Sequence, residues 1–164
     1  MKFTDLEQKH YLHNSNLKDL LDEIANGATV GKLLSNPTLA IGTSSKAKIK
    51  TAAFDYVING VFHTIASAET AFTATTHDIA DGSEAIYVLS INPTTEAMTL
   101  TMGTAVVSAD ADAVAPATPT GELKLGEVLI ATSGAAFDAS TTLLDAATVT
   151  DTYSSKTDYF SGLA

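Results

Sequence analysis

Two histidines near the start of the chain are the first residues that could bind a metal ion. His10 and His13 are three residues apart, so on a helix both imidazoles lie on one side. A zinc site needs three or four protein ligands, and the sequence marks no third ligand nearby. We therefore interpret both as ordinary exposed histidines and expect no metal there. A later histidine, His63, falls in an apolar alternating pattern, which predicts a hydrogen-bonded core residue.

Acidic residues form the second group with metal-binding chemistry. They fall in two short stretches: Asp78, Asp81 and Glu84, then Asp110 and Asp112. Clustered carboxylate oxygens suit calcium, but the twelve-residue spacing of a calcium-binding loop is absent. Two interpretations stay open, a structural cation or an acidic turn in which Asp81-Gly82 makes the bend.

No segment of the sequence has the spacing and residue types of a known catalytic motif. The segment Gly27-Ala28-Thr29-Val30-Gly31-Lys32-Leu33 imitates a phosphate-binding loop, but only three residues separate its glycines. Leu33 stands where a Ser or Thr would hold magnesium. No serine lies in a nucleophile elbow, and the absence of cysteine excludes thiol catalysis, disulfides and thiolate metal sites. We expect no enzymatic activity and no cofactor.

Charge is divided unevenly along the 164 residues. Seven of the nine lysines lie in the first fifty residues, whereas residues 51–164 hold two lysines against fourteen carboxylates, and the net charge is −10. Arginine is absent, and the only basic cluster is Lys46, Lys48 and Lys50, which we interpret as a solvated strand edge. We expect no nucleic-acid partner. No apolar run approaches the roughly 20 residues of a membrane span, and the start lacks a signal-peptide core, so we expect no membrane partner and synthesis in a cytoplasm.

The material for a hydrophobic core is sparse. The chain has no tryptophan, 7% aromatic residues, and 50 alanines and threonines taken together. Small side chains bury little area each, at roughly 25 cal/mol per Å². Burial between subunits would add to this core, and we expect a homo-oligomer, with a trimer favoured.

The elements that position these residues begin with a helical segment. Thr4-Asp5-Leu6-Glu7 is a capping box, and Asn26-Gly27 is a helix stop. Between them, four residues repeat at the spacing of an amphipathic helix: Leu17, Leu20, Leu21 and Ile24. This stripe needs an apolar partner, and we interpret it as a partner-binding anchor. The sequence predicts an anchor and connector over 1–37 and a β domain over 38–164.

The β domain begins with strong strand signals. A short strand is predicted over Thr38–Ile41, and strands Ile49–Ile58 and Val61–Ile65 flank Asn59-Gly60, a strong hairpin signal. A two-residue turn pairs Ile58 with Val61, Tyr56 with His63 and Phe54 with Ile65. These six residues then share one face, which we expect to be the core face.

The rest of the chain also predicts strands that are separated by turns and one long loop. Ile86–Ile91 predicts a strand buried on both sides, and Asn92–Thr95 turns it back into Glu96–Met102. Leu123 and Leu125 differ in parity from Val128 and Ile130, which predicts a β-bulge at Gly126-Glu127. Residues 108–121 are expected to be a loop, and Thr141–Tyr153 is β-prone. The expected fold is mainly β, an antiparallel β-sandwich or barrel with a short N-terminal helical segment.

The order of several segments resembles structural proteins of tailed-bacteriophage virions, of the decoration, head-fibre or tail-associated kind. The resemblance covers roughly residues 38–152. It is carried by Ala40–Ile49, Asp55–His63, Phe72–Ile79, Tyr87–Leu89, Pro119–Ile130 and Phe137–Ala146. It implies a non-enzymatic virion component and transfers no functional residues.

The expected function is therefore that of a capsid-bound decoration or cement protein, which is located in the virion and anchored by its N-terminal segment to the major capsid protein or another virion protein. Two alternatives remain. The chain could belong to the tail, neck or a fibre, or it could be a secreted carbohydrate-binding β module. The last class needs an aromatic platform, and the aromatics expected to be exposed are few and terminal: Tyr153, Tyr159 and Phe160.

Overall fold

The computed structural model describes residues 32–45, 47–58, 61–108 and 112–155, and in these ranges the chain is all-β with antiparallel sheets and no helix. The predicted helical segment and its anchor stripe lie outside the described residues. Nothing in the described ranges is a helix long and apolar enough to cross a membrane.

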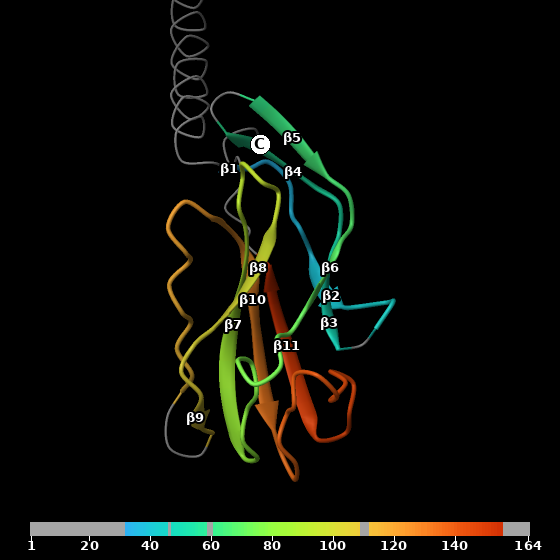
Figure 1. Ribbon diagram of the computed structural model, residues 1–164, viewed down its shortest axis with the longest axis vertical. Coiled ribbons are helices and arrows are strands. Elements are labelled where there is room, and N and C mark those ends of the chain that lie inside the picture. The colour runs from blue at the N-terminus through green and yellow to red at the C-terminus, as the bar shows by residue number, and fades with distance from the viewer. Residues whose placement is uncertain (1–31, 46, 59–60, 109–111, 156–164) are drawn as a thin grey trace, which may run out of the picture.

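Eleven strands make up the described chain (Figure 1). They are β1 Lys32–Leu33, β2 Leu39–Ile41, β3 Lys48–Thr51, β4 Phe54–Ile58, β5 Val61–Ile65, β6 Glu69–Ala71, β7 Ser83–Ile91, β8 Met98–Met102, β9 Val106–Val107, β10 Leu123–Thr132 and β11 Val149–Ser155. They form three sheets with the orders β1-β4-β5, β2-β3-β6 and β11-β10-β7-β8, and β9 pairs with β7.

The predicted strand over 49–58 is two strands. β3 pairs with β6 and β4 pairs with β5, yet both pairs keep one register, from Ile58↔Val61 to Lys48↔Ala71. The break falls where the backbone amide of Ala52 leaves the ladder and donates to the carbonyl oxygens of Pro37 (2.7 Å) and Thr38 (3.1 Å). One long hairpin therefore contributes to two sheets.

The central strand β7 confirms the prediction of burial on both faces, since Tyr87 to Ile91 are all buried. Tyr87, Leu89 and Ile91 face the main core, while Val88 and Ser90 lie on the opposite side of the sheet. On that side Ser90 donates to the Glu122 carboxylate. The predicted loop contributes residues 112–121, which contain no strand.

β10 contains a bulge, as the change of parity predicts, but it falls just before the expected position at Gly126-Glu127. The register with β7 shifts between Lys124↔Ser90 and Gly126↔Leu89, so Leu125 is the extra residue. Leu125, Val128 and Ile130 are consequently all in the core, with Leu123 packed against it.

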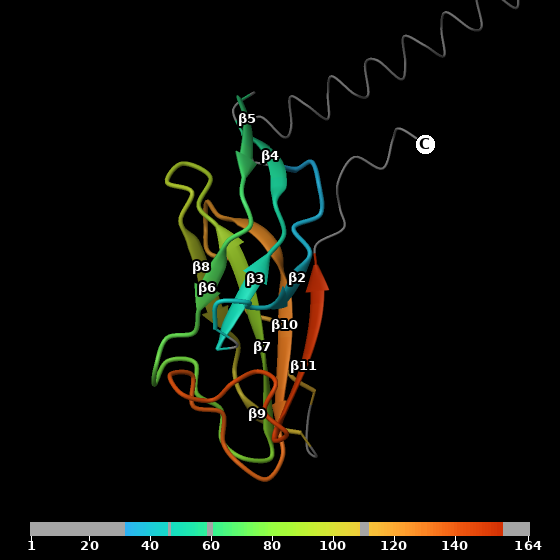
Figure 2. The ribbon, with the colours of Figure 1, turned by 90° about the vertical axis from the view of Figure 1, so that its right-hand side faces the viewer.

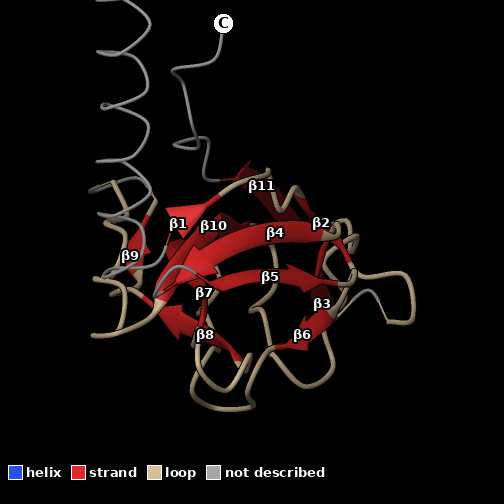
Figure 3. Ribbon diagram, turned by 90° about the horizontal axis from the view of Figure 1, so that it is seen from above, coloured by secondary structure: helices blue, strands red, loops and turns tan. Residues whose placement is uncertain are grey.

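One core lies between the sheets, which gives a sandwich-like architecture. The sheets approach along two seams. At one, the amide of Leu39 on β2 donates to Ser155 Oγ on β11 (2.8 Å). At the other, Thr70 on β6 contacts the sulfur of Met98 on β8 (3.7 Å). Seen from above, the β4–β5 hairpin crosses the end of the other two sheets (Figure 3).

The β structure starts before the boundary expected at residue 37. Lys32 and Leu33 form β1, which pairs with Val57 and Tyr56 of β4. Leu33 is only 2% exposed and belongs to the core. Residues 32–37 therefore pack with the β domain.

Candidate functional site

The β4–β5 hairpin occupies one end of the elongated body, beside β1, where the described chain begins (Figures 1 and 2). Its register is the one predicted, with Ile58↔Val61, Tyr56↔His63 and Phe54↔Ile65. Phe54 and Tyr56 are buried, and Ile58 and Ile65 pack against the core. Val61 shares this face but is 55% exposed, because it lies next to the hairpin tip.

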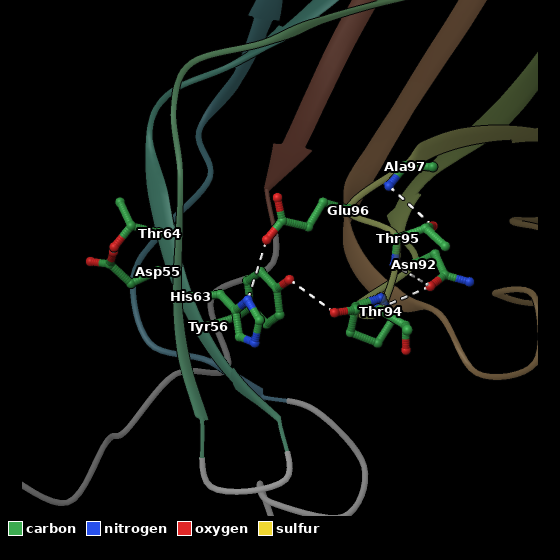
Figure 4. A network of polar contacts seen from close by, with 10 residues as sticks. Asp55, Tyr56, His63, Thr64, Asn92, Thr94, Thr95, Glu96 and Ala97 are labelled. Carbon is green, nitrogen blue, oxygen red and sulfur yellow. Dashed lines mark hydrogen bonds and ion pairs between the residues drawn. The ribbon is translucent and has the colours of Figure 1, made fainter.

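The inner face of the hairpin holds an aromatic and polar junction with the turn between β7 and β8 (Figure 4). The His63 ring stacks on Tyr56, with centroids 4.8 Å apart and planes 7° from parallel. Tyr56 donates its hydroxyl proton to the carbonyl oxygen of Pro93 (3.2 Å), and His63 Nδ1 lies 3.3 Å from Glu96 Oε1. His63 is hydrogen-bonded, as the sequence predicts, but its side chain is half-buried and not in the core.

The turn itself is ordered by Asn92. Its side-chain oxygen accepts from the amides of Thr94 (3.0 Å) and Thr95 (3.1 Å), and its carbonyl accepts from the amide of Glu96 (2.8 Å). Glu96 has φ of 58°, in the left-handed region that few non-glycine residues adopt. This backbone conformation directs the Glu96 carboxylate at His63 (Figure 4).

The junction holds the hairpin against the turn between β7 and β8. Burial, with a smaller contribution from the Glu96 charge, raises the pKa of Tyr56, so its hydroxyl stays protonated and donates to Pro93. His63 is held between this ring and Glu96. The arrangement fixes the hairpin on the body and thereby fixes the position of its outer face.

The outer face presents an exposed aromatic side chain. Phe62 is 69% exposed and lies on this outer face, whereas its neighbour Val61 points to the opposite face of the strand. Lys32, Val57 and Phe62 occupy one row across β1, β4 and β5. The described chain therefore begins two strands away from Phe62, in the same row of the sheet. An aromatic residue at an outward position of the predicted hairpin is the sequence signal that identifies this surface.

The acidic residues singled out from the sequence do not converge. Asp78 accepts from the amide of Ala139 (2.9 Å), Asp81 from that of Gly134 (2.7 Å) and Glu84 from that of Ala113 (3.2 Å). Gly82 has φ of 70°, which fits the acidic-turn interpretation. In the part of the chain that the structure describes, no group of three acidic or histidine residues could hold a metal ion.

The other predicted site residues fall in two groups. The anchor residues Leu17, Leu20, Leu21 and Ile24 lie outside the described residues, as do His10, His13, Lys46, Asp110, Tyr159 and Phe160. Lys48 and Lys50 are half-buried on β3, with their Nζ atoms 3.5 Å from Ser44 Oγ and Thr43 Oγ1. Tyr153, expected to be exposed, packs against the core with its hydroxyl buried. Burial, together with Asp151, raises the pKa of Tyr153.

Comparison of the chain with family models, with curated proteins and with solved structures finds no match.

Proposed function

We propose that the chain is a non-enzymatic structural protein of a tailed-bacteriophage virion, a capsid-bound decoration protein attached by its N-terminal segment to the major capsid protein or another virion protein. The ordered sequence resemblance over residues 38–152 gives the class. The distribution of charge in the described body supports the mode of attachment.

The charge distribution is the observation that carries the proposal. The loops joining β6 to β7 and β10 to β11 lie at the end of the body opposite the β4–β5 hairpin (Figures 1 and 2). These loops, residues 72–82 and 133–148, hold Asp78, Asp81, Asp138 and Asp145 and no lysine, and Glu84 follows at the start of β7. The acidic end thus points away from the end where the described chain begins. Such a surface, turned to solvent, keeps neighbouring copies apart by like-charge repulsion.

The finer features belong to the same proposal. Residues 4–26 form two short helices, the body is an antiparallel sandwich, and the chain assembles as a trimer. The stripe of Leu17, Leu20, Leu21 and Ile24 binds an apolar groove of the virion partner. Each of these side chains contributes roughly 1.5–3 kcal/mol if fully covered, before ordering costs. Simultaneous attachment of several copies raises occupancy further.

The proposal is tested with the double variant Leu20→Asp/Leu21→Asp. We expect this variant to lose attachment to particles that lack the native protein, because two carboxylates cannot be buried in an apolar groove. The matched control is Leu20→Met/Leu21→Met, which keeps the stripe apolar and should attach like the native chain. Copies per particle are counted by quantitative mass spectrometry, and circular dichroism checks the β body.

Full occupancy by the aspartate variant would place the anchor elsewhere and defeat this assignment. The copy number of the native chain separates the two virion locations. Hundreds of copies agree with a capsid-bound protein, whereas a handful assigns the chain to the tail, neck or a fibre.

A further inference from the structure

Among the residues that the structure describes, no strand pairs with the outer edge of β5. In its sheet β5 pairs only with β4, which in turn pairs with β1. The backbone of Asp55 on β4 is turned toward the β1 side, because its carbonyl accepts from the amide of Leu34 (2.8 Å) and its amide donates to Ser35 Oγ (2.8 Å). Asp55↔Thr64 is therefore a pair without backbone hydrogen bonds between its two strands.

The alternation of an antiparallel ladder then fixes the orientation of β5. Val57↔Phe62 is also a pair without backbone hydrogen bonds, so the N–H and C=O groups of Phe62 and Thr64 point away from β4. Among the described residues these four groups have no hydrogen-bond partner. The edge carries no lysine, proline or carboxylate, and it exposes Val61 and Phe62. Proteins usually block an exposed strand edge with lysine or another charged residue, or with proline.

An open groove continues along this edge. It has a volume of about 580 Å³ and is lined by Thr64 to Ala71, Glu96 and Met98. Its charged side chains are both carboxylates. Glu69 is occupied by hydrogen bonds from Thr43 and Ser44, whereas Glu96 is 51% exposed beside His63. The groove thus combines a free backbone edge, apolar Ile65 and Met98, and an accessible negative charge.

We propose that β5 binds an extended segment with a basic side chain, supplied by the protein to which the N-terminal segment attaches. The segment adds a strand to β5 through the Phe62 and Thr64 backbone groups. Its basic side chain lies along Met98 and reaches Glu96. The strand addition stands on the geometry of β5; only the source of the segment rests on the proposed function.

The position of Lys32, where the described chain begins, is the reason for naming the attachment partner as the source of the added segment. Lys32 is in the same row as Phe62, two strand spacings or about 10 Å away. Ile24 precedes Lys32 by eight residues, which span at most about 28 Å when extended. A partner that holds the stripe ending at Ile24 is therefore within reach of β5. A second copy fits less well, because each copy carries a net charge of −10 and one five-residue strand covers far less than the roughly 1,200 Å² of a stable interface.

Attachment to particles tests the backbone groups with two variants of one residue. Thr64→Pro removes the free N–H, which β4 does not use, while Thr64→Ala removes only the side-chain bond to Asp55. We expect Thr64→Pro to attach about tenfold more weakly than Thr64→Ala. Phe62→Lys places a lysine on the edge at an exposed position and should weaken attachment similarly. This second variant keeps the test valid if the proline variant fails to fold. Native-like attachment of both Thr64→Pro and Phe62→Lys would overturn the proposal.

The source of the segment is identified by placing a photo-crosslinking amino acid at residue 62 of the full chain on particles. A cross-link to an extended segment of a virion protein supports the proposal, and cross-links only to another copy of this chain would contradict it. Amide hydrogen exchange gives a second readout. In the free protein the amides of Phe62 and Thr64 should exchange faster than those of His63 and Ile65, and on particles they should become protected.

A synthetic peptide separates this proposal from the proposed function. The probe is acetyl-Thr-Val-Lys-Val-Thr-amide, with a Glu-for-Lys twin as control, titrated onto the isotope-labelled full chain. Saturable shifts of the Phe62 and Thr64 amides with the lysine peptide alone support the strand-addition site, even if the chain fails to bind particles. Absence of shifts, with particle attachment intact, would leave the proposed function standing and remove this inference.

Discussion

A single carboxylate orders the turn between β2 and β3. Glu69 on β6 accepts from the amide of Thr43 (2.6 Å), from its hydroxyl (2.9 Å) and from the amide of Ser44 (2.9 Å), and also from the Ser44 hydroxyl. These hydrogen bonds, those from Ser44 foremost, lower the pKa of Glu69 to about 2. Nothing in the local sequence of Glu69 marks this role, because its partners are some 25 residues away in the chain.

We predict that Glu69→Gln removes part of the acid sensitivity of folding. A carboxyl group with a lowered folded-state pKa adds stability above its unfolded pKa, near 4.5, and loses it as the pH falls toward about 2. The variant should be less stable than the native chain at pH 7 and should differ less from it near pH 2. Urea unfolding across this range measures the difference. Glu127→Gln, which leaves the Gly42–Ser45 turn untouched, is the control, and equal pH profiles for all three chains would refute the role.

His77 is the second titratable residue that orders the fold. It is buried, its Nδ1 accepts from the amide of Thr73 (2.9 Å), and its ring lies edge-on to Phe72 and Tyr87. Because Nδ1 is an acceptor, the neutral ring carries its proton on Nε2. Burial lowers the pKa of His77, opposed by a hydrogen bond with the Leu100 backbone and by the Asp78 charge.

Folding should therefore weaken as the pH falls below about 6.5, the ordinary pKa of histidine. The unfolded chain binds the proton more readily than the folded one, so stability from His77 is complete above that value and declines below it. His77→Asn keeps an acceptor near the position of Nδ1 but cannot titrate there. We expect it to lose about 1–3 kcal/mol at pH 7 through lost ring packing. Its stability should then change less between pH 7 and 5 than that of the native chain, measured by urea unfolding. An unchanged slope would exclude His77 as the source.

At the scale of elements, the features that could be predicted from the sequence are those fixed by neighbours in the chain. The Asn59-Gly60 signal sets the register of β4 and β5, and the change of parity at Gly126 sets the bulge in β10. Both are decided within a few residues.

Features decided by distant segments could not be predicted. The break between β3 and β4 depends on the carbonyl groups of Pro37 and Thr38. The candidate site could be predicted only in part. The hairpin and the place of His63 on its inner face are decided locally, whereas the free edge of β5 follows from the contacts of Asp55 with Leu34 and Ser35.

Close packing against β11 and β2 explains why residue 126 is glycine. A Cβ atom there would lie 2.6 Å from the carbonyl oxygen of Ser154 and 2.7 Å from Leu39 Cδ1, at the seam between β11 and β2. We predict that Gly126→Ala destabilises the chain by about 1–3 kcal/mol, because β11 must move away. Gly134→Ala is a control with no atom within 4 Å of the new Cβ, although its positive φ adds a backbone cost. Thermal unfolding and amide exchange of β11 check the prediction, and unaltered exchange in β11 would contradict it.

At the scale of the whole molecule, the place where the β body begins determines which truncations fold. Leu33 fills the core beside Tyr56, and the amide of Leu34 donates to Asp55. Residues 32–37 thus connect the hairpin end to the body. Pro37, the last of them, accepts a hydrogen bond from the backbone amide of Ala52. A body that begins at residue 38 lacks these contacts.

We predict that a fragment of residues 32–164 folds, whereas a fragment of residues 38–164 is less stable by roughly 2–5 kcal/mol, the range for deleting a buried leucine. The difference arises because the shorter fragment exposes the cavity left by Leu33 and loses the β1 pairing with Tyr56 and Val57. Leu33→Ala in the full chain is the matched control, since it creates the same cavity with the backbone of β1 intact. Urea unfolding followed by circular dichroism gives the three values. If the two fragments unfold at the same urea concentration, Leu33 does not stabilise the body, and the boundary at residue 37 stands as the sequence predicts it.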